Sequence, residues 1–228
     1  MELNKIYNQD CLVGMQEIPD KSIPMILTDI PYGKLNDISE SGMRKLKKGD
    51  ADSVTFDLKE LVDTLCRKTT QTIYMFCSTE QVSTIRETMD ANGMTTRLCI
   101  WEKTNPSPMN GEYLWLSSVE CCVFGRFPKA TFHEFCKSPV WHYPCGQSNE
   151  HPTQKPVDLF RYIIRTSSNH GDTILDPFMG SGTTAIAAIR EGRKFIGFEI
   201  SEQYYHLANK RLRQLTGPFH LFGNIGAE

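Results

Sequence analysis

Residues 173–199, TILDPFMGSGTTAIAAIREGRKFIGFE, carry the clearest indication of the fold class. An apolar strand-like run ends at Asp176, and a loop with Gly180 and Gly182 leads into a helical run. A second apolar run then ends at Glu199. This is the order of a βαβ unit, in which glycine lets the backbone approach a ligand closely and turn sharply into the helix. The stretch therefore predicts the ligand-binding unit of a parallel sheet.

The same alternation of strand-like and helical runs continues through most of the chain. Strands are predicted at residues 5–8, 24–30, 72–78, 95–103, 119–127, 173–176 and 194–200, and helices at 11–18, 57–68, 79–93, 155–168, 183–192 and 201–215. Alternating strands and helices form a parallel sheet with helices on both faces. We therefore predict a single α/β domain over residues 1–228, with a doubly wound and mostly parallel sheet.

Length and composition set limits on this domain. A chain of 228 residues with 39% hydrophobic content can bury one α/β core with a small insertion, but not two substantial domains. The net charge of -2 gives no general positive field, so a nucleic-acid contact must come from a local basic surface. The eight scattered cysteines are typical of reduced thiols. Without a signal-peptide pattern or membrane-spanning run, we expect a cytoplasmic protein.

The loop that begins at Asp176 does not match a dinucleotide site. It has GSG in place of GxGxxG, and it has no lysine for a phosphate. Asp176 at the strand tip suits a cationic amino-acid group, and Glu199 can accept hydrogen bonds from both hydroxyls of a ribose. A structural turn that uses glycine only for packing is the alternative, but the two strand-end carboxylates favour a ligand.

Three blocks of the sequence together resemble a known family. DPFMGSGTT (176–184), FIGFE (195–199) and HPTQKP (151–156) are similar to the cofactor signature of the DNA amino-methyltransferases with the permuted, or beta, order of motifs. The resemblance implies a seven-stranded methyltransferase sheet, S-adenosylmethionine as cofactor and double-stranded DNA as substrate. The cofactor contacts that it implies are Asp10, Thr153, Lys155, Asp176, Pro177, Phe178, Gly180, Ser181, Gly182, Thr183 and Glu199.

Two residues of that set also have a plain structural interpretation. The resemblance places Lys155, with Thr153, near the methionine carboxylate of the cofactor, and it places Asp10 near the adenine amino group. Lys155 also fits an ordinary solvated lysine before a helix. Asp10 fits equally well as the N-cap of the helix that begins at Cys11.

The second informative motif is TDIPYG, residues 28–33, at the end of the predicted strand 24–30. An exocyclic amine on a base is a poor nucleophile because its lone pair is delocalised into the ring. Two acceptors aimed at its protons return the lone pair to nitrogen and stabilise the positive charge that develops there. Asp29 can supply one acceptor and the backbone carbonyl of Ile30 the other. Tyr32 offers a face on which an extruded base can stack.

TDIPYG resembles the (D/N/S)PPY motif of the family, but Ile30 stands where the first proline is expected. The family uses the main-chain carbonyl of that residue, which isoleucine also has. Isoleucine lacks the fixed φ of proline, although Pro31 still holds the residue before it extended. We therefore expect a catalytic turn of Asp29, Ile30, Pro31 and Tyr32 that is less preorganised but keeps its chemistry.

The two motifs can act together only if they meet in the fold. In a doubly wound sheet, ligands bind at the carboxyl ends of the strands where the strand order reverses. We predict that strands 24–30 and 173–176 are neighbours at that point. Methyl donor and target amine would then be held within attack distance.

Candidate DNA-binding residues lie in two segments. The basic residues after the catalytic motif are Lys34, Arg44, Lys45, Lys47 and Lys48. They can contact phosphates or close over a flipped nucleotide, and a solvated surface loop is an equal alternative. WEKTNPSPMNG, residues 101–111, resembles a block that lines the target-base pocket of related enzymes. It points to Asn105 and Pro106, whereas Trp101 fits better as the end of a strand.

Residues 127–150 show little periodicity and form the predicted recognition segment. Within it, His133-x-x-Cys136 and His142-x-x-Cys145 have a spacing that a small zinc site allows. No pair of CxxC motifs supports such a site, so we predict no metal. Because so short a segment reads few base pairs alone, we expect a homodimer or a partner subunit.

Together these features predict a DNA methyltransferase that acts on the N6 amine of adenine. Aspartate rather than serine at the head of the motif favours adenine over N4 of cytosine within the family. Glutamine methyltransferases of the release-factor type carry a similar turn, but their cofactor loop precedes it, whereas Asp29 precedes Gly180 here. Two competing hypotheses are an RNA methyltransferase and a cofactor-binding module that has lost activity through Ile30.

Overall fold

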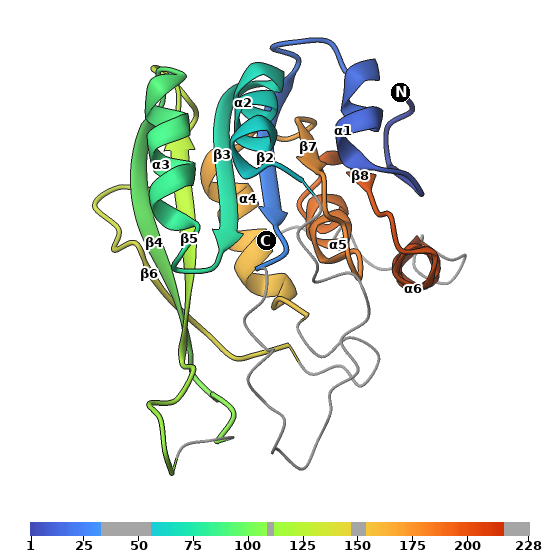
Figure 1. Ribbon diagram of the computed structural model, residues 1–228. Helices are drawn as coiled ribbons and strands as arrows, with labels where there is room; N and C mark the ends of the chain where they lie inside the picture. Colours follow the sequence, from blue (N-terminus) through green and yellow to red (C-terminus); the bar gives the residue numbers. More distant parts are fainter. Residues whose placement is uncertain (33–55, 109–111, 147–153, 217–228) are drawn as a thin grey trace, which may run out of the picture.

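The computed structural model describes residues 1–32, 56–108, 112–146 and 154–216. These residues contain one sheet with the strand order β1-β8-β7-β2-β3-β5-β4-β6 (Figure 1). The strands are β1 (Lys5–Tyr7), β2 (Ile23–Asp29), β3 (Thr69–Cys77), β4 (Thr95–Lys103), β5 (Val119–Arg126), β6 (Val140–Tyr143), β7 (Thr173–Asp176) and β8 (Lys194–Phe198). Among these strands, β5 is antiparallel to its neighbours β3 and β4, and every other pair is parallel.

Helices cover both faces of the sheet (Figure 1). One face carries α1 (Cys11–Gly14), the 3-10 turn η1 (Met15–Glu17), α2 (Leu58–Lys68) and α3 (Val82–Ala91). The other face carries α4 (Val157–Ser167), α5 (Thr183–Arg190) and α6 (Glu202–Thr216). Each helical layer packs an apolar core against the sheet, so the fold is a three-layer α/β sandwich.

Strand β2 shows how both cores are built from one run of sequence. Ile26 packs with helices α1 to α3, and its neighbours Met25 and Leu27 pack with α4 to α6. All three side chains are fully buried. Successive side chains of a strand point to opposite faces, so a strand covered on both faces has a continuous apolar run rather than an alternating one.

The strand order reverses between β7 and β2. From β7 the chain continues through α5 to β8 on one side, and from β2 it continues through α2 to β3 on the other. Met25 pairs with Ile174, and Ile26 pairs with Leu175, in parallel register. The predicted adjacency of the two strands is therefore confirmed, and their carboxyl ends lie side by side where ligands bind in such sheets.

The doubly wound, mostly parallel α/β fold is confirmed, but the described residues form eight strands rather than seven. The additional strand, β6, lies within the predicted recognition segment and pairs with β4. Trp141 of β6 is buried, and the centre of its ring lies 6.2 Å from that of Phe76. A four-residue edge strand is too short for its periodicity to be visible in a sequence.

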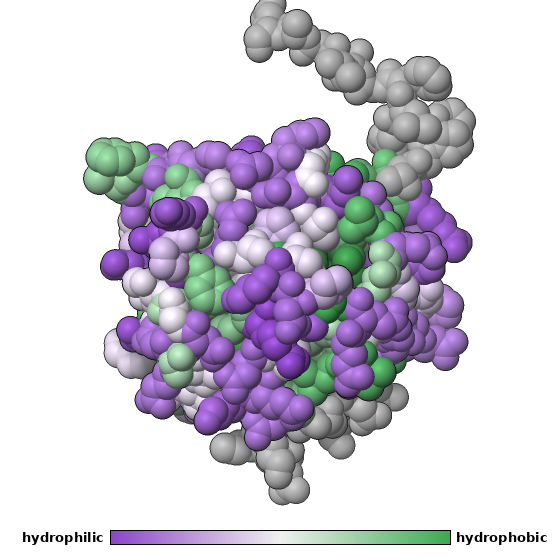
Figure 2. All heavy atoms as spheres, turned by 90° about the horizontal axis from the view of Figure 1, so that it is seen from above, coloured by the Kyte–Doolittle hydropathy of each residue, from purple (hydrophilic) through white to green (hydrophobic). Residues whose placement is uncertain are grey.

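At the opposite end of the sheet, where the parallel strands begin, the described residues show no comparable concentration of predicted site residues. Seen from that side, the described surface is mostly hydrophilic, with apolar atoms in separate patches (Figure 2). No helix in the described part of the chain is both long and apolar enough to cross a lipid bilayer. The predicted functional residues that the structure describes gather instead toward the carboxyl ends of β2, β7 and β8.

Candidate active site

The turn after β2 is held by contacts on both sides. Ile30 is buried in the core beneath α1 to α3, and its N–H donates a hydrogen bond to the carbonyl of Phe76 at 3.2 Å. A proline at position 30 could not make this bond because it has no N–H. The carbonyl of Pro31 accepts a hydrogen bond from the side-chain amide of Gln81 at 3.0 Å. Burial of Ile30 and these two hydrogen bonds therefore compensate for the fixed φ angle that a proline at position 30 would have provided.

The carboxylate of Asp29 has two partners at the end of β2. Its Oδ1 atom lies 2.9 Å from the hydroxyl of Tyr32, and its Oδ2 atom lies 2.6 Å from the ammonium of Lys155. Burial raises the pKa of Asp29, Lys155 lowers it and the negative charge of Glu120 raises it, with a net shift upward. Burial and the same two carboxylates raise the pKa of Tyr32 well above its ordinary value, so its hydroxyl stays protonated.

Lys155 reaches this turn from the segment just before α4. Its ammonium also lies 2.9 Å from Oε2 of Glu120 and 3.1 Å from the hydroxyl of Tyr32, so each of its three N–H groups has an acceptor. The side chain is 5% exposed, and the interpretation as a solvated lysine is therefore wrong. The predicted contact of Lys155 with the methionine carboxylate stays a prediction, and it requires one of these three bonds to open.

Glu120 and Lys103 complete the group, and the sequence analysis missed both. Glu120 is the second residue of β5, and its Oε1 atom lies 2.8 Å from the ammonium of Lys103 at the end of β4. Burial by itself raises the pKa of Glu120, but the charges of Lys155 and Lys103 lower it to about 2. We call Asp29, Lys155, Glu120 and Lys103 the active-site charge cluster. Because β5 is antiparallel to β3, the first residues of β5 lie at the end of the sheet where β2 ends. The direction of β5, which the sequence analysis did not predict, therefore places Glu120 in the site.

The glycine loop runs from the end of β7 into α5. Gly180 and Gly182 have φ values of 53° and 84°, in the left-handed region that favours glycine. A Cβ atom on Gly182 would lie 3.1 Å from the Cβ atom of Ala208 in α6, so this position also needs a small residue. The N–H of Gly180 donates a hydrogen bond to the Glu199 carboxylate at 2.7 Å. The loop is thereby fixed to the end of β8.

Asp176 is buried beneath this loop. Its Oδ1 atom accepts hydrogen bonds from the Thr28 hydroxyl at 2.8 Å and the Phe178 N–H at 3.0 Å. Its Oδ2 atom accepts one from the Thr184 hydroxyl. Burial raises the pKa of Asp176 to about 7. The carboxyl group therefore joins β7 to β2 one residue before Asp29, and its contact with a cationic ligand stays a prediction.

The end of β8 supplies a second carboxylate next to the loop. Glu199 accepts a hydrogen bond from the N–H of Ser201 at 2.8 Å in addition to that from Gly180, and burial raises its pKa. A carboxylate has about four acceptor positions. These backbone hydrogen bonds leave acceptor capacity on the carboxylate, and the predicted contact of Glu199 with a ribose stays a prediction.

The turn after β1 lies against this strand end. The side-chain amide of Asn8 donates hydrogen bonds to the carbonyls of Glu199 at 2.8 Å and Ile200 at 3.2 Å. Asp10, two residues later, accepts a hydrogen bond from the N–H of Val13 at 3.0 Å and so caps α1. The structure thus shows the N-cap role of Asp10, and its contact with the cofactor adenine stays a prediction.

The remaining predicted cofactor residues in the described chain are Pro177, Phe178, Ser181 and Thr183. Phe178 packs its ring 5.2 Å from that of Phe56. The hydroxyl and carbonyl of Ser181 accept hydrogen bonds from Arg211 of α6. The hydroxyl of Thr183 is buried without a hydrogen-bond partner among the described residues. An unsatisfied hydroxyl at the start of α5, beside backbone N–H groups that a helix leaves free, fits a polar ligand at this loop.

The predicted DNA-contacting residues have different outcomes. Those that lie outside the described residues are Lys34, Arg44, Lys45, Lys47 and Lys48, together with Gly33 of the catalytic motif and Thr153 of the cofactor set. Trp101 is buried, and its indole N–H donates to the Tyr143 carbonyl at 2.9 Å, so it belongs to the core of the sheet. Asn105 accepts a hydrogen bond from the Cys145 N–H at 2.6 Å, and Pro106 is partly buried. Base contacts by Asn105 and Pro106 stay predictions.

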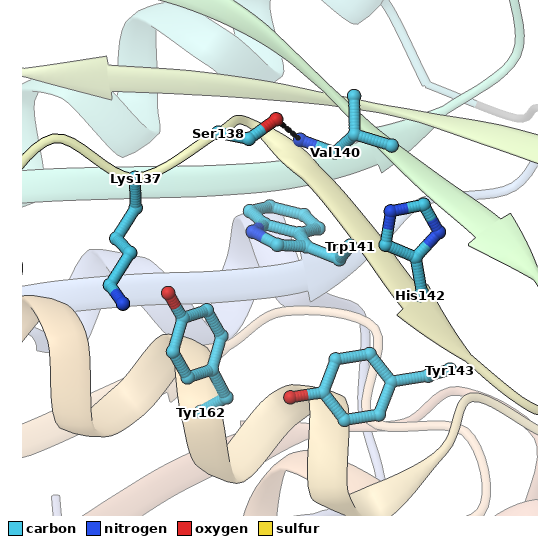
Figure 3. Close-up of a pocket in the computed structure, with 7 residues that line it drawn as sticks. All are labelled: Lys137, Ser138, Val140, Trp141, His142, Tyr143 and Tyr162. Atoms are coloured by element: carbon cyan, nitrogen blue, oxygen red, sulfur yellow. Dashed lines mark hydrogen bonds between the residues drawn. The ribbon is translucent and has the colours of Figure 1, made fainter.

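A separate shallow hollow of about 320 Å³ lies in the recognition segment, between β6 and α4 (Figure 3). Trp141 and Tyr143 of β6 face Tyr162 of α4 across it. No member of the active-site charge cluster is among its lining residues, so it is distinct from the site at β2 and β7. In the ranges that the structure describes, no three His, Cys, Asp or Glu side chains are grouped as metal ligands.

The site has two halves, the glycine loop after β7 and the turn with Asp29 after β2, which lie at neighbouring strand ends of a doubly wound sheet. A family model described as DNA methylase matches residues 112–210. The type II methyltransferase M2.LlaDCHI of Lactococcus lactis subsp. cremoris is 32% identical, over 92% of this chain and 89% of the relative. The type II methyltransferase M2.MboI of Moraxella bovis is 29% identical, over 92% and 88%. The chain therefore belongs to the DNA methylase family.

Solved structures agree with this assignment. The crystal structure of the M1.HpyAVI–SAM complex superposes with a TM-score of 0.70 at 27% identity, covering 91% of this chain and 98% of that one. The predicted cofactor, S-adenosylmethionine, is thereby confirmed for this family. The cytosine-N4-specific PvuII DNA methyltransferase superposes with a TM-score of 0.69 at 18% identity, covering 98% and 88%. That second likeness concerns the fold alone and does not select a target base.

Proposed function

We propose that the chain transfers a methyl group from S-adenosylmethionine to the N6 amine of adenine in double-stranded DNA. The observation that carries the proposal is the hydrogen bond from Thr28 to Asp176, which joins the strand end bearing Asp29 to the glycine loop after β7. Neighbouring strands lie about 4.8 Å apart. A donor at the loop and an amine at Asp29 are therefore close enough for direct transfer, for which positioning is the main requirement.

The residues of the turn have separate tasks in this reaction. The cofactor supplies a methyl group on a positively charged sulfur. Asp29 accepts one hydrogen bond from the target amine, and the carbonyl of Ile30 accepts a second. Together they return the lone pair to nitrogen and stabilise its developing positive charge. The raised pKa of Asp29 makes its carboxylate a better acceptor for the proton that the amine releases after transfer.

Tyr32 offers its ring as the stacking surface for an extruded base. Its hydroxyl lies within hydrogen-bond distance of Asp29, Glu120 and Lys155. These contacts fix the orientation of the ring before the base arrives. A stacking surface that is already ordered does not lose side-chain entropy on binding, which favours the bound state.

Adenine is favoured over cytosine by the residue at the head of the motif. Asp29 stands at the position where the adenine-specific pattern of the family has aspartate and the cytosine-specific pattern has serine. The carboxylate of Asp29 lies at the end of β2, where it is 29% exposed and paired with Lys155. Cytosine N4, RNA and protein amides are the competing targets, and methyl labelling separates them from adenine.

The described parts of the loop between β4 and β5, residues 104–108 and 112–118, support a DNA-facing surface here. The loop starts and ends beside the active-site charge cluster, because Lys103 and Glu120 flank it. Trp115 is fully exposed, and Tyr113, Leu114 and Leu116 are also exposed among the described residues of this loop. Exposed apolar groups of this kind mark binding surfaces, and similar side chains insert between base steps in some DNA complexes.

Incubation with methyl-labelled S-adenosylmethionine and duplex DNA tests the proposal. After digestion of the DNA to nucleosides, mass spectrometry should find the label in N6-methyladenine. The Asp29→Ala variant should bind the cofactor but transfer no label. Label in N4-methylcytosine would refute the choice of base, and label only in RNA or protein would refute DNA as the substrate. Cofactor binding without transfer in the unchanged protein would support the inactive binding module.

Two wider expectations stay predictions. A recognition segment of this size favours a homodimer or a partner subunit, and a DNA substrate favours a cytoplasmic location. Light scattering of the protein with and without DNA tests the first. A monomer that methylates one defined sequence by itself would refute it.

A further inference from the structure

Glu120 lies at the centre of the active-site charge cluster, although neither of the two sequence motifs contains it. Its Oε2 atom lies 2.9 Å from the ammonium of Lys155 and 3.0 Å from the hydroxyl of Tyr32. Its Oε1 atom lies 2.8 Å from the ammonium of Lys103. Both oxygens therefore have polar partners, and the side chain is only 18% exposed. A carboxylate with this many directed contacts orients its partners as well as itself.

The charges of the cluster alternate and balance. Asp29 and Glu120 are negative, Lys155 lies between them, and Lys103 lies on the far side of Glu120. The two lysine side chains are 5% and 13% exposed. Buried ammonium groups need opposite charge nearby. If Glu120 lost its charge, Asp29 would be the remaining anionic partner of Lys155 in the described cluster, and the two would pair more tightly.

We propose that Glu120 is a positioning residue for methyl transfer, which holds Lys155 and Tyr32 so that Asp29 can accept the target amine. The inference rests on the proposed function, because it assumes that Asp29 binds an amine. Lys155 is bonded to the Oδ2 atom of Asp29 in this structure, so an incoming amine competes with it. Glu120 provides a second carboxylate for the Lys155 ammonium, which keeps an anionic partner when Asp29 accepts a hydrogen bond from the amine instead.

Glu120 also controls the charge that the reacting nitrogen meets. A nitrogen that becomes positive is disfavoured by a pocket with net positive charge and favoured by a balanced one. With Glu120 neutralised, the cluster would carry one excess positive charge next to the acceptor Asp29. The effect of this change therefore falls mainly on the chemical step, because Glu120 contacts neither the glycine loop nor Glu199 among the described contacts.

The same geometry predicts how Asp29 titrates. The titratable groups that face it are Lys155, Glu120, Tyr32, Asp176, Cys77 and Cys122. Burial keeps the two thiols and the hydroxyl neutral at physiological pH by raising the pKa of each. Glu120 stays ionised because its pKa is about 2, and its charge raises the pKa of Asp29. Removing that charge should therefore lower the pKa of Asp29.

The test compares Glu120→Gln with a matched substitution, Glu87→Gln, at an exposed position on α3. Glutamine keeps the shape of Glu120 and removes its charge. We expect a kcat for DNA methylation at least tenfold lower in E120Q, a Kd for S-adenosylmethionine within twofold of the unchanged protein, and an acid limb of the kcat profile at lower pH. E87Q should match the unchanged protein in all three measurements.

A second variant and a second measurement keep the inference testable if E120Q folds poorly. Lys103→Met removes a contact of Glu120 but leaves the charge of Glu120 in place. This variant should therefore not move the acid limb of the kcat profile to lower pH. Carboxyl carbon NMR of the substrate-free protein, with Asp29 assigned from Asp29→Asn, measures the pKa of Asp29 without any activity. It should fall in E120Q and should not fall in K103M.

The possible results separate the inference from the proposed function. If E120Q keeps its kcat, or loses it while the pKa of Asp29 is unchanged, the positioning role is refuted and the DNA methylation remains. A K103M protein in which the pKa of Asp29 falls would also refute it. If the unchanged protein transfers no methyl group to DNA, the proposed function itself is refuted, and the NMR titration still decides whether Glu120 controls Asp29.

Discussion

Replacing Asp176 with asparagine should change how the stability of the protein depends on pH. The carboxyl group of Asp176 has an ordinary pKa of 3.8, which burial raises to about 7 in the folded chain. Between these two values the folded state binds a proton that the unfolded state releases. Stability therefore falls as the pH rises through this window and is level above it. Asparagine has no such proton, so D176N loses this dependence.

The expected magnitude follows from the width of the window. One pKa unit corresponds to about 1.4 kcal/mol, and most of the interval between pH 5 and pH 8 lies inside the window. The unfolding free energy of D176N should therefore rise relative to the unchanged protein by roughly 3 kcal/mol over that interval. Any cost of the asparagine amide facing the Thr184 hydroxyl does not depend on pH, so it shifts the whole difference without changing its slope.

Urea unfolding of both proteins without cofactor, at unit steps from pH 5 to pH 8, measures this difference. Thr28→Val gives a second check, because the Thr28 hydroxyl donates to Asp176 and lowers its pKa. In T28V the loss of stability should extend to higher pH. If the curves of D176N and the unchanged protein run parallel across the whole range, Asp176 does not hold its proton in the folded state and the reasoning fails.

Three further substitutions test the loop and the turns. Ile30→Pro, which restores the residue typical of the family, should lower the unfolding free energy by about 2 kcal/mol because it removes a buried side chain and a hydrogen bond; equal stability in chemical denaturation would contradict this. Gly182→Ala should destabilise the protein more than Gly171→Ala. Both glycines have φ near +83°, but a Cβ atom at Gly182 meets Ala208 whereas one at Gly171 meets open space. Equal melting temperatures of the two variants would show that Ala208 moves aside. Asp10→Ala should cost about 1 kcal/mol through the lost helix cap while Asp10→Asn keeps it, and an unaffected D10A would disprove the cap.

The parts of the fold that could be predicted are those with a local signal. The βαβ unit at residues 173–199 is visible because glycine, strand and helix patterns follow one another in a fixed order. The pairing of β7 with β2 could also be predicted, because it follows from the doubly wound topology and was confirmed by the register of Met25 with Ile174. In contrast, β6 is defined by its pairing with β4, and the sequence of these four residues alone does not indicate which strand they pair with.

The same distinction explains the active site. Asp29 and the glycine loop belong to motifs, so their residue types carry information by themselves. The positions of Lys155 and Glu120 depend on three-dimensional neighbours. Lys155 contacts Asp29, which lies 126 positions away in the sequence, and Glu120 reaches the site because β5 runs antiparallel to β3. Sequence motifs identified Lys155 but not its contact with Asp29. They contained no indication of Glu120, because a single glutamate in an apolar strand usually marks an edge or an exposed face.

The bond between Thr28 and Asp176 has a consequence for how enzymes of this shape can diverge. It belongs to two adjoining strands of the central sheet, so in the proposed reaction the gap between methyl donor and acceptor follows from β-sheet spacing and not from any connecting loop. The loops that contact DNA can then lengthen, shorten or change composition without altering that gap. Target preference can vary widely on such a scaffold while the reaction itself is inherited intact.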